Sequence, residues 1–167
     1  MASSPHLSIS RERLEGYKAA LTDNNIPIND GYIKYCNHGG MVIAEIEDAI
    51  KDLMQMKQRP DAIFCAGDRL TISCLTALKE LGIKIPADIG VVGFTNSELV
   101  ELIDPSLTAV KQPAFEMGQI ATELLIKLIE AKRPITEFET VTLQTELCVR
   151  NSTNNVNEKV KMKKLVM

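Results

Sequence analysis

Few side chains in this sequence of 167 residues are of the types that carry out catalysis. Its two histidines, His6 and His38, stand in stretches that predict a loop and a turn. The sequence contains no Gly-x-Ser-x-Gly elbow, no Walker phosphate loop, no Gly-x-Gly-x-x-Gly loop and no His-Glu-x-x-His helix. Because histidine is the commonest general base, we predict that the chain is not an enzyme.

Asp68 is the polar residue best placed to meet a ligand. It follows Ala62–Ala66, an apolar run typical of a strand buried on both faces of a parallel sheet. Open α/β sheets bind ligands at the carboxyl ends of their strands. Asp68 could instead cap the helix that follows it. A phosphoacceptor role is the weakest of the three, because the strand end at Gly93-Phe94-Thr95 lacks the further acidic residues that Mg²⁺ needs.

The four cysteines form no metal-binding pattern. Cys36, Cys65, Cys74 and Cys148 are scattered, with no Cys-x-x-Cys pair, and are most simply reduced thiols. Cys65 and Cys74 stand among apolar residues and are predicted to fill the core.

Two features near His38 could hold an ion, but each has a simpler explanation. Cys36-Asn37-His38 is a Cys-x-His triplet without the second ligand pair that zinc sites need. Gly39-Gly40 before a helix could cradle an anion, although paired glycines are commoner as turn residues. We predict no metal and no cofactor.

The distribution of charge argues against nucleic acid binding by most of the chain. The net charge is −3, and residues 151–167 hold four Lys and one Glu, so the first 150 residues carry −6. A DNA backbone requires a basic surface. No apolar stretch is long enough for a membrane span, and Met1–Ser10 lacks the apolar centre of a secretory signal. We therefore expect a cytoplasmic protein.

Predicted helices and strands alternate along the chain. Strands that alternate with long helices are typical of βαβ units and of a parallel sheet with helices on both faces. The expected helices are Ser8–Asp23 with Ser8 as its cap, Met41–Met56, Asp68–Leu81, a short one at Asn96–Ile103, and Pro113–Ala131. The expected strands are Tyr32–Cys36, Ala62–Ala66, Ile89–Gly93, Leu107–Val110 and Thr140–Val149.

Several phrases of the sequence, in this order and spacing, resemble the effector-binding domain of LacI/GalR-family transcriptional regulators. They are Ser10–Tyr17, Arg59–Phe64, Gly67–Leu70, Ile85–Phe94, Leu107–Pro113 and Glu116–Gly118. The resemblance covers residues 3–152. It implies a fold like that of periplasmic sugar-binding proteins, which have two α/β lobes joined by crossovers.

The resemblance also implies a division of the chain. Residues 1–152 would be a partial effector-binding domain, mostly its C-terminal lobe, in which residues 112–137 make an excursion into the N-terminal lobe. Residues 153–167 would be a flexible basic tail. The helix-turn-helix head of the family would lie outside this chain.

The resemblance implies that the chain is the effector-sensing and dimerisation portion of a LacI-type regulator, with a small molecule of the carbohydrate class as ligand. Such a chain would contact DNA only through the absent head. A solute-binding component of a sugar transporter shares the fold and is the alternative. A small doubly wound enzyme is disfavoured by the scarcity of catalytic groups.

Four residues match ligand-contact positions of the family. Arg13 matches an arginine that contacts effector hydroxyls, and its fork of donors suits vicinal hydroxyls. Asp68 matches the second member of an Asn-Asp pair, with Gly67 in place of the first. Thr95 stands where the family has an aspartate, so a charge-assisted hydrogen bond is lost. Gln112 lies at a crossover that often carries a polar contact.

The family dimerises through its second lobe, which implies a dimer surface on two segments of this chain. The residues that match it are Leu70, Thr71 and Cys74 in the helix after Asp68, and Leu99, Leu102 and Ile103 further along.

Overall fold

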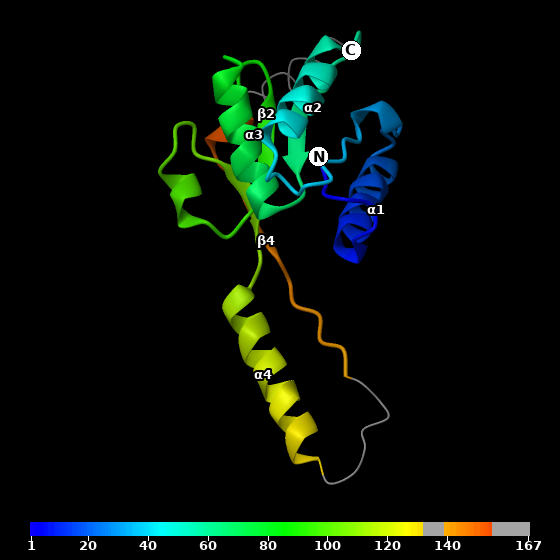
Figure 1. Ribbon diagram of the computed structural model, residues 1–167, viewed down its shortest axis with the longest axis vertical. Coiled ribbons are helices and arrows are strands. Elements are labelled where there is room, and N and C mark those ends of the chain that lie inside the picture. The colour runs from blue at the N-terminus through cyan, green and yellow to red at the C-terminus, as the bar shows by residue number, and fades with distance from the viewer. Residues whose placement is uncertain (132–138, 155–167) are drawn as a thin grey trace.

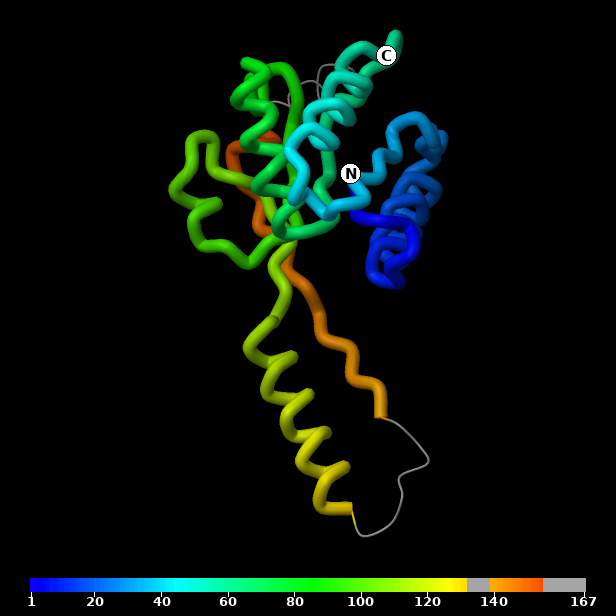
Figure 2. The backbone as a smooth tube through the Cα atoms, in the orientation of Figure 1, coloured from blue at the N-terminus to red at the C-terminus, as the bar shows by residue number. Residues whose placement is uncertain are grey.

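The chain forms a globular body with a helical arm that projects from it (Figure 1). This structure is a computed structural model, and it describes residues 1–131 and 139–154. The body contains the sheet and three helices, and two passages of the chain run side by side from the body to the arm (Figure 2).

A four-stranded sheet in the order β1-β2-β3-β4 forms the centre of the body. Strands β1 (Ala62–Cys65), β2 (Gly90–Phe94) and β3 (Thr108–Lys111) run parallel. The last strand, β4 (Glu146–Cys148), pairs with β3 in the antiparallel direction. The predicted α/β class with a mainly parallel sheet is confirmed, with β4 as the exception.

Helices cover one face of this sheet, and a further helix contacts the other face. On one face, α3 (Asp68–Glu80) packs on β1 and β2, and α2 (Ile43–Gln55) packs beside α3. On the other face, α1 (Ser8–Asp23) reaches the sheet through Arg13, which stacks on Phe94 of β2. Gly82, with a φ of 69°, follows α3 and provides the left-handed residue typical of a helix end.

The hydrophobic core lies between the sheet and the helix pair α2–α3. Alternation along β1 and β2 buries Ile63, Cys65 and Val91 on this face and leaves Phe64 and Phe94 half-buried on the other. The core residues from the helices are Ile46, Ala49, Ile50 and Leu53 of α2 and Leu70, Cys74, Ala77 and Leu78 of α3.

The first two residues of the chain lie inside the body, between β1 and the segment Tyr32–Cys36. The Met1 amino group donates to Phe64 O (2.7 Å), and Ala66 N donates to Met1 O (2.9 Å). On the other side, Ala2 N donates to Lys34 O (2.9 Å) and Cys36 N donates to Ala2 O (2.8 Å). Ala2 and Tyr35 thus form a parallel bridge.

Three local predictions were wrong. Tyr32–Cys36 forms that single bridge rather than a strand, and it begins in a 3-10 helix, Asp30–Tyr32. Of the predicted strand Thr140–Val149, only Glu146–Cys148 reaches a partner, because the preceding residues run along the arm. Ser8 is the first residue of α1 and follows a cap, Leu7, that has no side-chain hydrogen bond. Two further 3-10 helices span Glu98–Glu101 and Asn151–Thr153.

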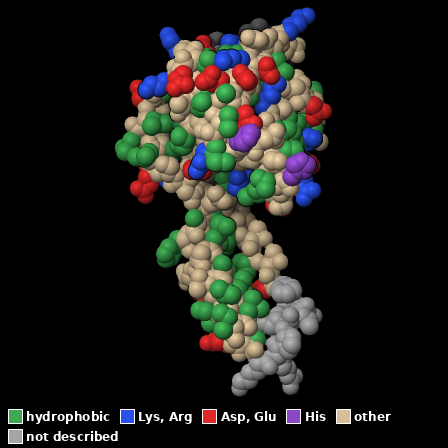
Figure 3. Space-filling view, in the orientation of Figure 1, with side chains coloured by type: hydrophobic (Ala, Val, Ile, Leu, Met, Phe, Trp, Pro, Cys, Tyr) green, Lys and Arg blue, Asp and Glu red, His purple; other side chains and the backbone are tan. Residues whose placement is uncertain are grey.

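The arm consists of α4 (Ala114–Glu130) and the extended residues that return to β4. None of the α4 residues is buried, although Phe115, Leu125 and Ile129 are large and apolar. Hydrophobic side chains lie along the arm in Figure 3. The predicted boundary at residue 137 and the residues of the predicted tail from 155 onward lie outside the described residues.

Candidate functional site

The polar residues predicted to bind a ligand gather at the carboxyl ends of β1, β2 and β3. Asp68 follows β1, Thr95 follows β2 and Gln112 follows β3, while Arg13 reaches the same edge from α1. Parallel strands end on one side of a sheet, so the topology brings together residues that are distant in the sequence.

Asp68 and Thr95 contact each other directly. The Thr95 hydroxyl donates to Asp68 Oδ1 and accepts from Ser97 N (3.1 Å). Thr95 is only 1% exposed, whereas Asp68 is exposed. Thr95 therefore holds the carboxylate in place, and Asp68 Oδ2, which makes no hydrogen bond to a described residue, is the oxygen available to a ligand.

Arg13 is fixed by two contacts. Its Nη1 donates to Ala66 O at 2.7 Å, and its guanidinium carbon lies 3.8 Å from the centre of the Phe94 ring. Stacking on an aromatic ring and a carbonyl partner both favour a fixed guanidinium. Partial burial lowers the pKa of Arg13, while the neighbouring Glu12 opposes that shift. The guanidinium stays cationic at neutral pH because an arginine pKa is so high.

Thr71 links the turn after β1 to the end of β2. Its hydroxyl donates to Gly67 O (2.7 Å) and accepts from Phe94 N (3.3 Å). A Cβ on Gly93 would lie 2.5 Å from Thr71 Cγ2, so this close packing requires glycine. The backbone that carries Asp68 and Thr95 is thereby held by buried contacts.

Gln112 is engaged through its main chain. Its N–H donates to Asn96 Oδ1 (2.8 Å), and Asn96 Nδ2 donates to Gln112 O (2.9 Å). Sequence reasoning did not assign a role to Asn96 or to Phe94. The available signal was their position, an aromatic residue and an amide on either side of Thr95 at a strand end.

The burial of three α3 residues corrects the dimer surface that was predicted on this helix. Leu70, Thr71 and Cys74 are almost completely buried, because α3 turns them toward the sheet and α2. They form part of the core and cannot contact a second chain. Leu99 and Leu102, by contrast, are 66% and 82% exposed, and Ile103 is also exposed.

Three of the four cysteine side chains lie in the core. Within the described residues, no group of three or more His, Cys, Asp or Glu side chains could hold a metal ion. Cys36, Cys65 and Cys74 are buried free thiols, and burial raises the pKa of Cys36 to about 11. A thiol with a raised pKa is a poor nucleophile and a poor metal ligand at neutral pH.

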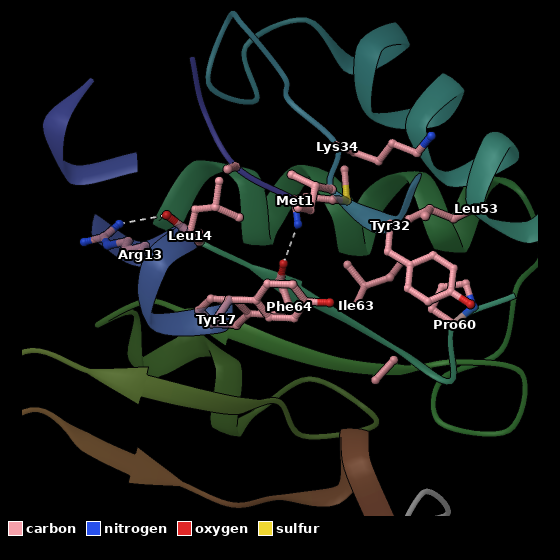
Figure 4. Close-up of a pocket in the computed structure, with 14 residues that line it drawn as sticks. Met1, Arg13, Leu14, Tyr17, Tyr32, Lys34, Leu53, Pro60, Ile63 and Phe64 are labelled. Carbon is pink, nitrogen blue, oxygen red and sulfur yellow. Dashed lines mark hydrogen bonds between the residues drawn. The ribbon is translucent and has the colours of Figure 1, made fainter. Parts of the chain in front are cut away.

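Two cavities flank the edge of the sheet at which β1, β2 and β3 end. One, lined mainly by apolar side chains of α1, β1 and the N-terminal residues, is drawn in Figure 4. The other, of about 390 Å³, is a groove in the arm between α4 and residues 141–145. It includes Gln112, Met117 and Leu124, so the Gln112 side chain lies where body and arm meet.

No helix in the described part of the chain is long and apolar enough to cross a membrane.

Comparison with known proteins gives a consistent assignment. A family described as "Periplasmic binding protein-like domain" matches residues 1–153. The HTH-type transcriptional regulator RegA of Clostridium acetobutylicum is 40% identical over 118 residues, which cover 71% of this chain and 34% of that protein.

Two further proteins that resemble this chain are also named as regulators of transcription. The HTH-type transcriptional repressor PurR of Vibrio parahaemolyticus is 32% identical over 147 residues, covering 88% of this chain and 42% of that protein. The solved structure of a transcriptional regulator CelR-cellobiose complex superimposes with a TM-score of 0.75 at 28% identity, covering 91% of this chain and 45% of that one. This chain thus spans less than half the length of these relatives.

The relatives are named as transcriptional regulators rather than as enzymes or transporter components, in agreement with the predicted absence of enzymatic activity. With the family match over residues 1–153, the mainly parallel sheet and the superposition on solved regulators, the chain belongs to the periplasmic binding protein-like domain family and resembles solved LacI-family transcriptional regulators.

Proposed function

We propose that this chain is the effector-sensing portion of a LacI-type regulator and that its ligand is a small molecule rich in hydroxyl groups. The observation that carries the proposal is that a fixed cationic donor, Arg13, and a held carboxylate acceptor, Asp68, lie at the same edge of the sheet. Vicinal hydroxyls both donate and accept, so they match such a pair.

Direct contact with the ligand is assigned to Arg13 and Asp68. Thr95 acts by orienting Asp68, because its hydroxyl is already used twice. The Gln112 side chain is assigned to the same ligand from the crossover. One solved relative is a complex with cellobiose, which supports a carbohydrate as the chemical class.

The division of the chain is part of this proposal. Residues 1–152 would form mostly the C-terminal lobe of the effector-binding domain, and residues 112–137 an excursion that belongs to the N-terminal lobe. The exposed apolar side chains of α4 support this, since they would be covered by that lobe. DNA would be contacted by a head domain of the longer regulator in the cytoplasm, since the body is acidic.

A homodimer through Leu99, Leu102 and Ile103 completes the proposal. These side chains follow β2 around the 3-10 helix Glu98–Glu101, where Figure 3 shows hydrophobic side chains at the left of the body. Val100 of this segment is buried in the core and anchors the segment to the body. An anchored loop with apolar side chains facing outward is suited to pairing with a second copy.

The test is a titration of the chain with cellobiose, ribose and, as a molecule without hydroxyls, adenine, followed by calorimetry or by the shift in melting temperature. Cellobiose or ribose is expected to bind with a dissociation constant on the order of 1 mM, and Arg13→Ala is expected to weaken binding about tenfold or more. Arg11→Ala, an exposed change on the same helix, is the matched control. Equal binding by both variants would exclude Arg13 as the contact.

A further inference from the structure

The segment proposed to pair with a second copy, Leu99–Ile103, turns most of its side chains outward, and we call it the dimer segment. It lies in the loop at the left of the body in Figure 1. Of its five residues, only Val100 is buried. Its main chain makes a 3-10 turn, in which Leu102 N and Ile103 N donate to Leu99 O (3.0 and 3.3 Å). A single turn of this kind has poor hydrogen-bond geometry, so contacts with the body must fix its shape.

Glu101 is the side chain that ties the dimer segment to the sheet. Its Oε1 accepts from Lys111 Nζ at 3.2 Å and from Arg150 Nη2. Lys111 is the last residue of β3, and Arg150 follows β4, so the two cations come from neighbouring strands. The hydrogen bond from Lys111 and then the charge of Arg150 lower the pKa of Glu101. The carboxylate is therefore ionised at neutral pH and held from two sides.

Arg150 stands on a base of buried hydrogen bonds. Its main-chain N donates to Thr108 Oγ1 at 2.8 Å. Two residues further on, the Ser152 hydroxyl accepts from Thr108 N (2.8 Å) and donates to Val91 O (2.6 Å). Thr108 and Ser152 are both buried, so these bonds are protected from water. The backbone of Arg150 is thereby fixed against β2 and β3.

The Arg150 side chain uses two arms of its guanidinium. Nη1 donates to Leu107 O at 2.9 Å, while Nη2 donates to Glu101. An arginine fork presents its donors at fixed angles, so two simultaneous acceptors are held at a fixed separation. Leu107 N also donates to Val100 O at 2.8 Å. Leu107 thus contacts the dimer segment through its N–H and Arg150 through its carbonyl.

We propose that Arg150 is the positioning residue of the dimer surface, and that it acts through Glu101 to hold the dimer segment in the conformation that pairs with a second copy of this chain. The inference rests on the dimer of the proposed function. A segment that is ordered before binding loses less conformational entropy on association than a mobile one does. The affinity of the dimer should therefore depend on Arg150 although the apolar contacts are made by other residues.

A role for Glu101 through its charge alone makes the opposite prediction. A two-fold dimer brings the same surface of both copies together, so a carboxylate in the dimer segment is brought toward its own copy. Removing Glu101 would then relieve repulsion and tighten the dimer. If Glu101 instead positions the segment, its removal weakens the dimer. The sign of the change separates the two explanations.

The test is sedimentation equilibrium of the full chain and of two alanine variants. Glu101→Ala is expected to raise the dissociation constant of the dimer about tenfold or more. Glu98→Ala is the matched control, because it removes the same charge from the first residue of the same 3-10 helix. Glu98 is exposed and makes no ion pair with a described residue. Its removal is expected to leave the dissociation constant unchanged or to lower it.

Amide hydrogen exchange measures the order of the segment without reference to the dimer. At a concentration at which the chain is a monomer, exchange at Leu102 and Ile103 is expected to be at least about threefold faster in Glu101→Ala than in Glu98→Ala. Glu101 is exposed, so the fold is expected to survive its removal, and circular dichroism checks this.

A double-variant cycle tests whether Arg150 acts through Glu101. Arg150→Lys keeps the positive charge but lacks the fork, and it is expected to weaken the dimer at least about threefold. In the Glu101→Ala background, the same change should add less than about twofold, because the shared contact is already lost. If Arg150→Lys does not fold, the comparison of Glu101→Ala with Glu98→Ala still decides.

Unchanged exchange at Leu102 and Ile103 in Glu101→Ala would overturn the positioning role. Faster exchange with an equal or tighter dimer would overturn the connection between order and pairing. Multiplied effects in the double variant would show that Arg150 acts by another route. A native chain that sediments as a monomer at every concentration would instead refute the dimer of the proposed function, and the exchange data would still decide whether the ion pairs hold the segment.

Discussion

The side-chain amide of Asn96 pairs with the main chain of Gln112 in both directions. It accepts from Gln112 N at 2.8 Å and donates to Gln112 O at 2.9 Å. The pair adds a rung to the ladder after β2 and β3 end, at the position where the chain leaves the body for α4. Asn96 therefore fixes the path along which the arm departs.

Changing Asn96 to Asp is expected to loosen this connection. Asp keeps the acceptor for Gln112 N but replaces the donor with a carboxylate oxygen that repels Gln112 O. The loss of one hydrogen bond costs about 1 kcal/mol of unfolding free energy. Urea unfolding checks the stability, and spin-label distances between body and arm check the predicted broadening of arm positions. Gln58→Glu, an amide-to-acid change at an exposed residue, is the control, and the same broadening there would contradict the assignment.

Replacing Gly93 by Ala is expected to destabilise the body by about 1–3 kcal/mol. The new Cβ would lie 2.5 Å from Thr71 Cγ2 and 3.0 Å from Leu107 Cδ2, and both neighbours are buried. Gly16→Ala is the matched control, since nothing lies within 4 Å of a Cβ there and alanine favours the helix. The midpoint of chemical denaturation should fall for Gly93→Ala and rise for Gly16→Ala. A loss of stability in both variants would point to a different cause.

The ion pairs of Glu101 are expected to make stability depend on pH. A hydrogen bond from Lys111, and then the charge of Arg150, lower the pKa of Glu101. A carboxyl whose folded pKa lies below its unfolded value stabilises the protein above the unfolded pKa, and this contribution is lost as the pH falls through the folded pKa. The loss therefore begins near the ordinary pKa of a glutamate and continues below it.

The measurement is the difference in melting temperature between the native chain and Glu101→Gln at pH 7 and at pH 3. The difference should shrink on acidification and also in high salt, because the group is exposed. Glu15→Gln, which removes an exposed carboxylate from the middle of α1, is the matched control. A constant difference for Glu101→Gln would show that its ion pairs do not contribute.

A charge at Leu102 is expected to abolish the proposed dimer. Leu102→Glu places a carboxylate on a side chain that is 82% exposed, so the fold should keep its stability within about 0.5 kcal/mol. Sedimentation should then give a monomer. Phe115→Glu on the arm, at a residue 87% exposed, should leave the dimer intact. The reverse pattern would move the interface to the arm.

The fold could be predicted to a large extent because its signals are local. The apolar run before Asp68 and the periodic stripe of α2 each identify one element, and their alternation gives the class. The direction of β4 has no local signal, since it depends on where the chain returns from the arm. The Tyr32–Cys36 segment has the pattern of a strand, but within the described residues its one bridge partner is Ala2, which is too little pairing to form a strand.

The candidate site could be predicted only in part. Its position after a predicted strand indicated Asp68, whereas only the family resemblance indicated Arg13; both lie at the expected edge. The stacking of Arg13 on Phe94 depends on how a helix meets a strand on the far face, which no spacing reveals. The burial of Thr71 depends on the rotation of α3 about its axis, and an amphipathic helix with a mixed sequence does not fix that angle closely.

Lys111 and Glu146 face each other across the β3–β4 ladder. Opposed residues of an antiparallel pair lie about 5 Å apart, a separation that a two-residue turn can close. Residues 112–145 are therefore an insertion at a point where the polypeptide would otherwise simply reverse. The register of β3 against β4 is therefore set at the body end of the arm, by Lys111 and Glu146, and does not require an arm of any particular length.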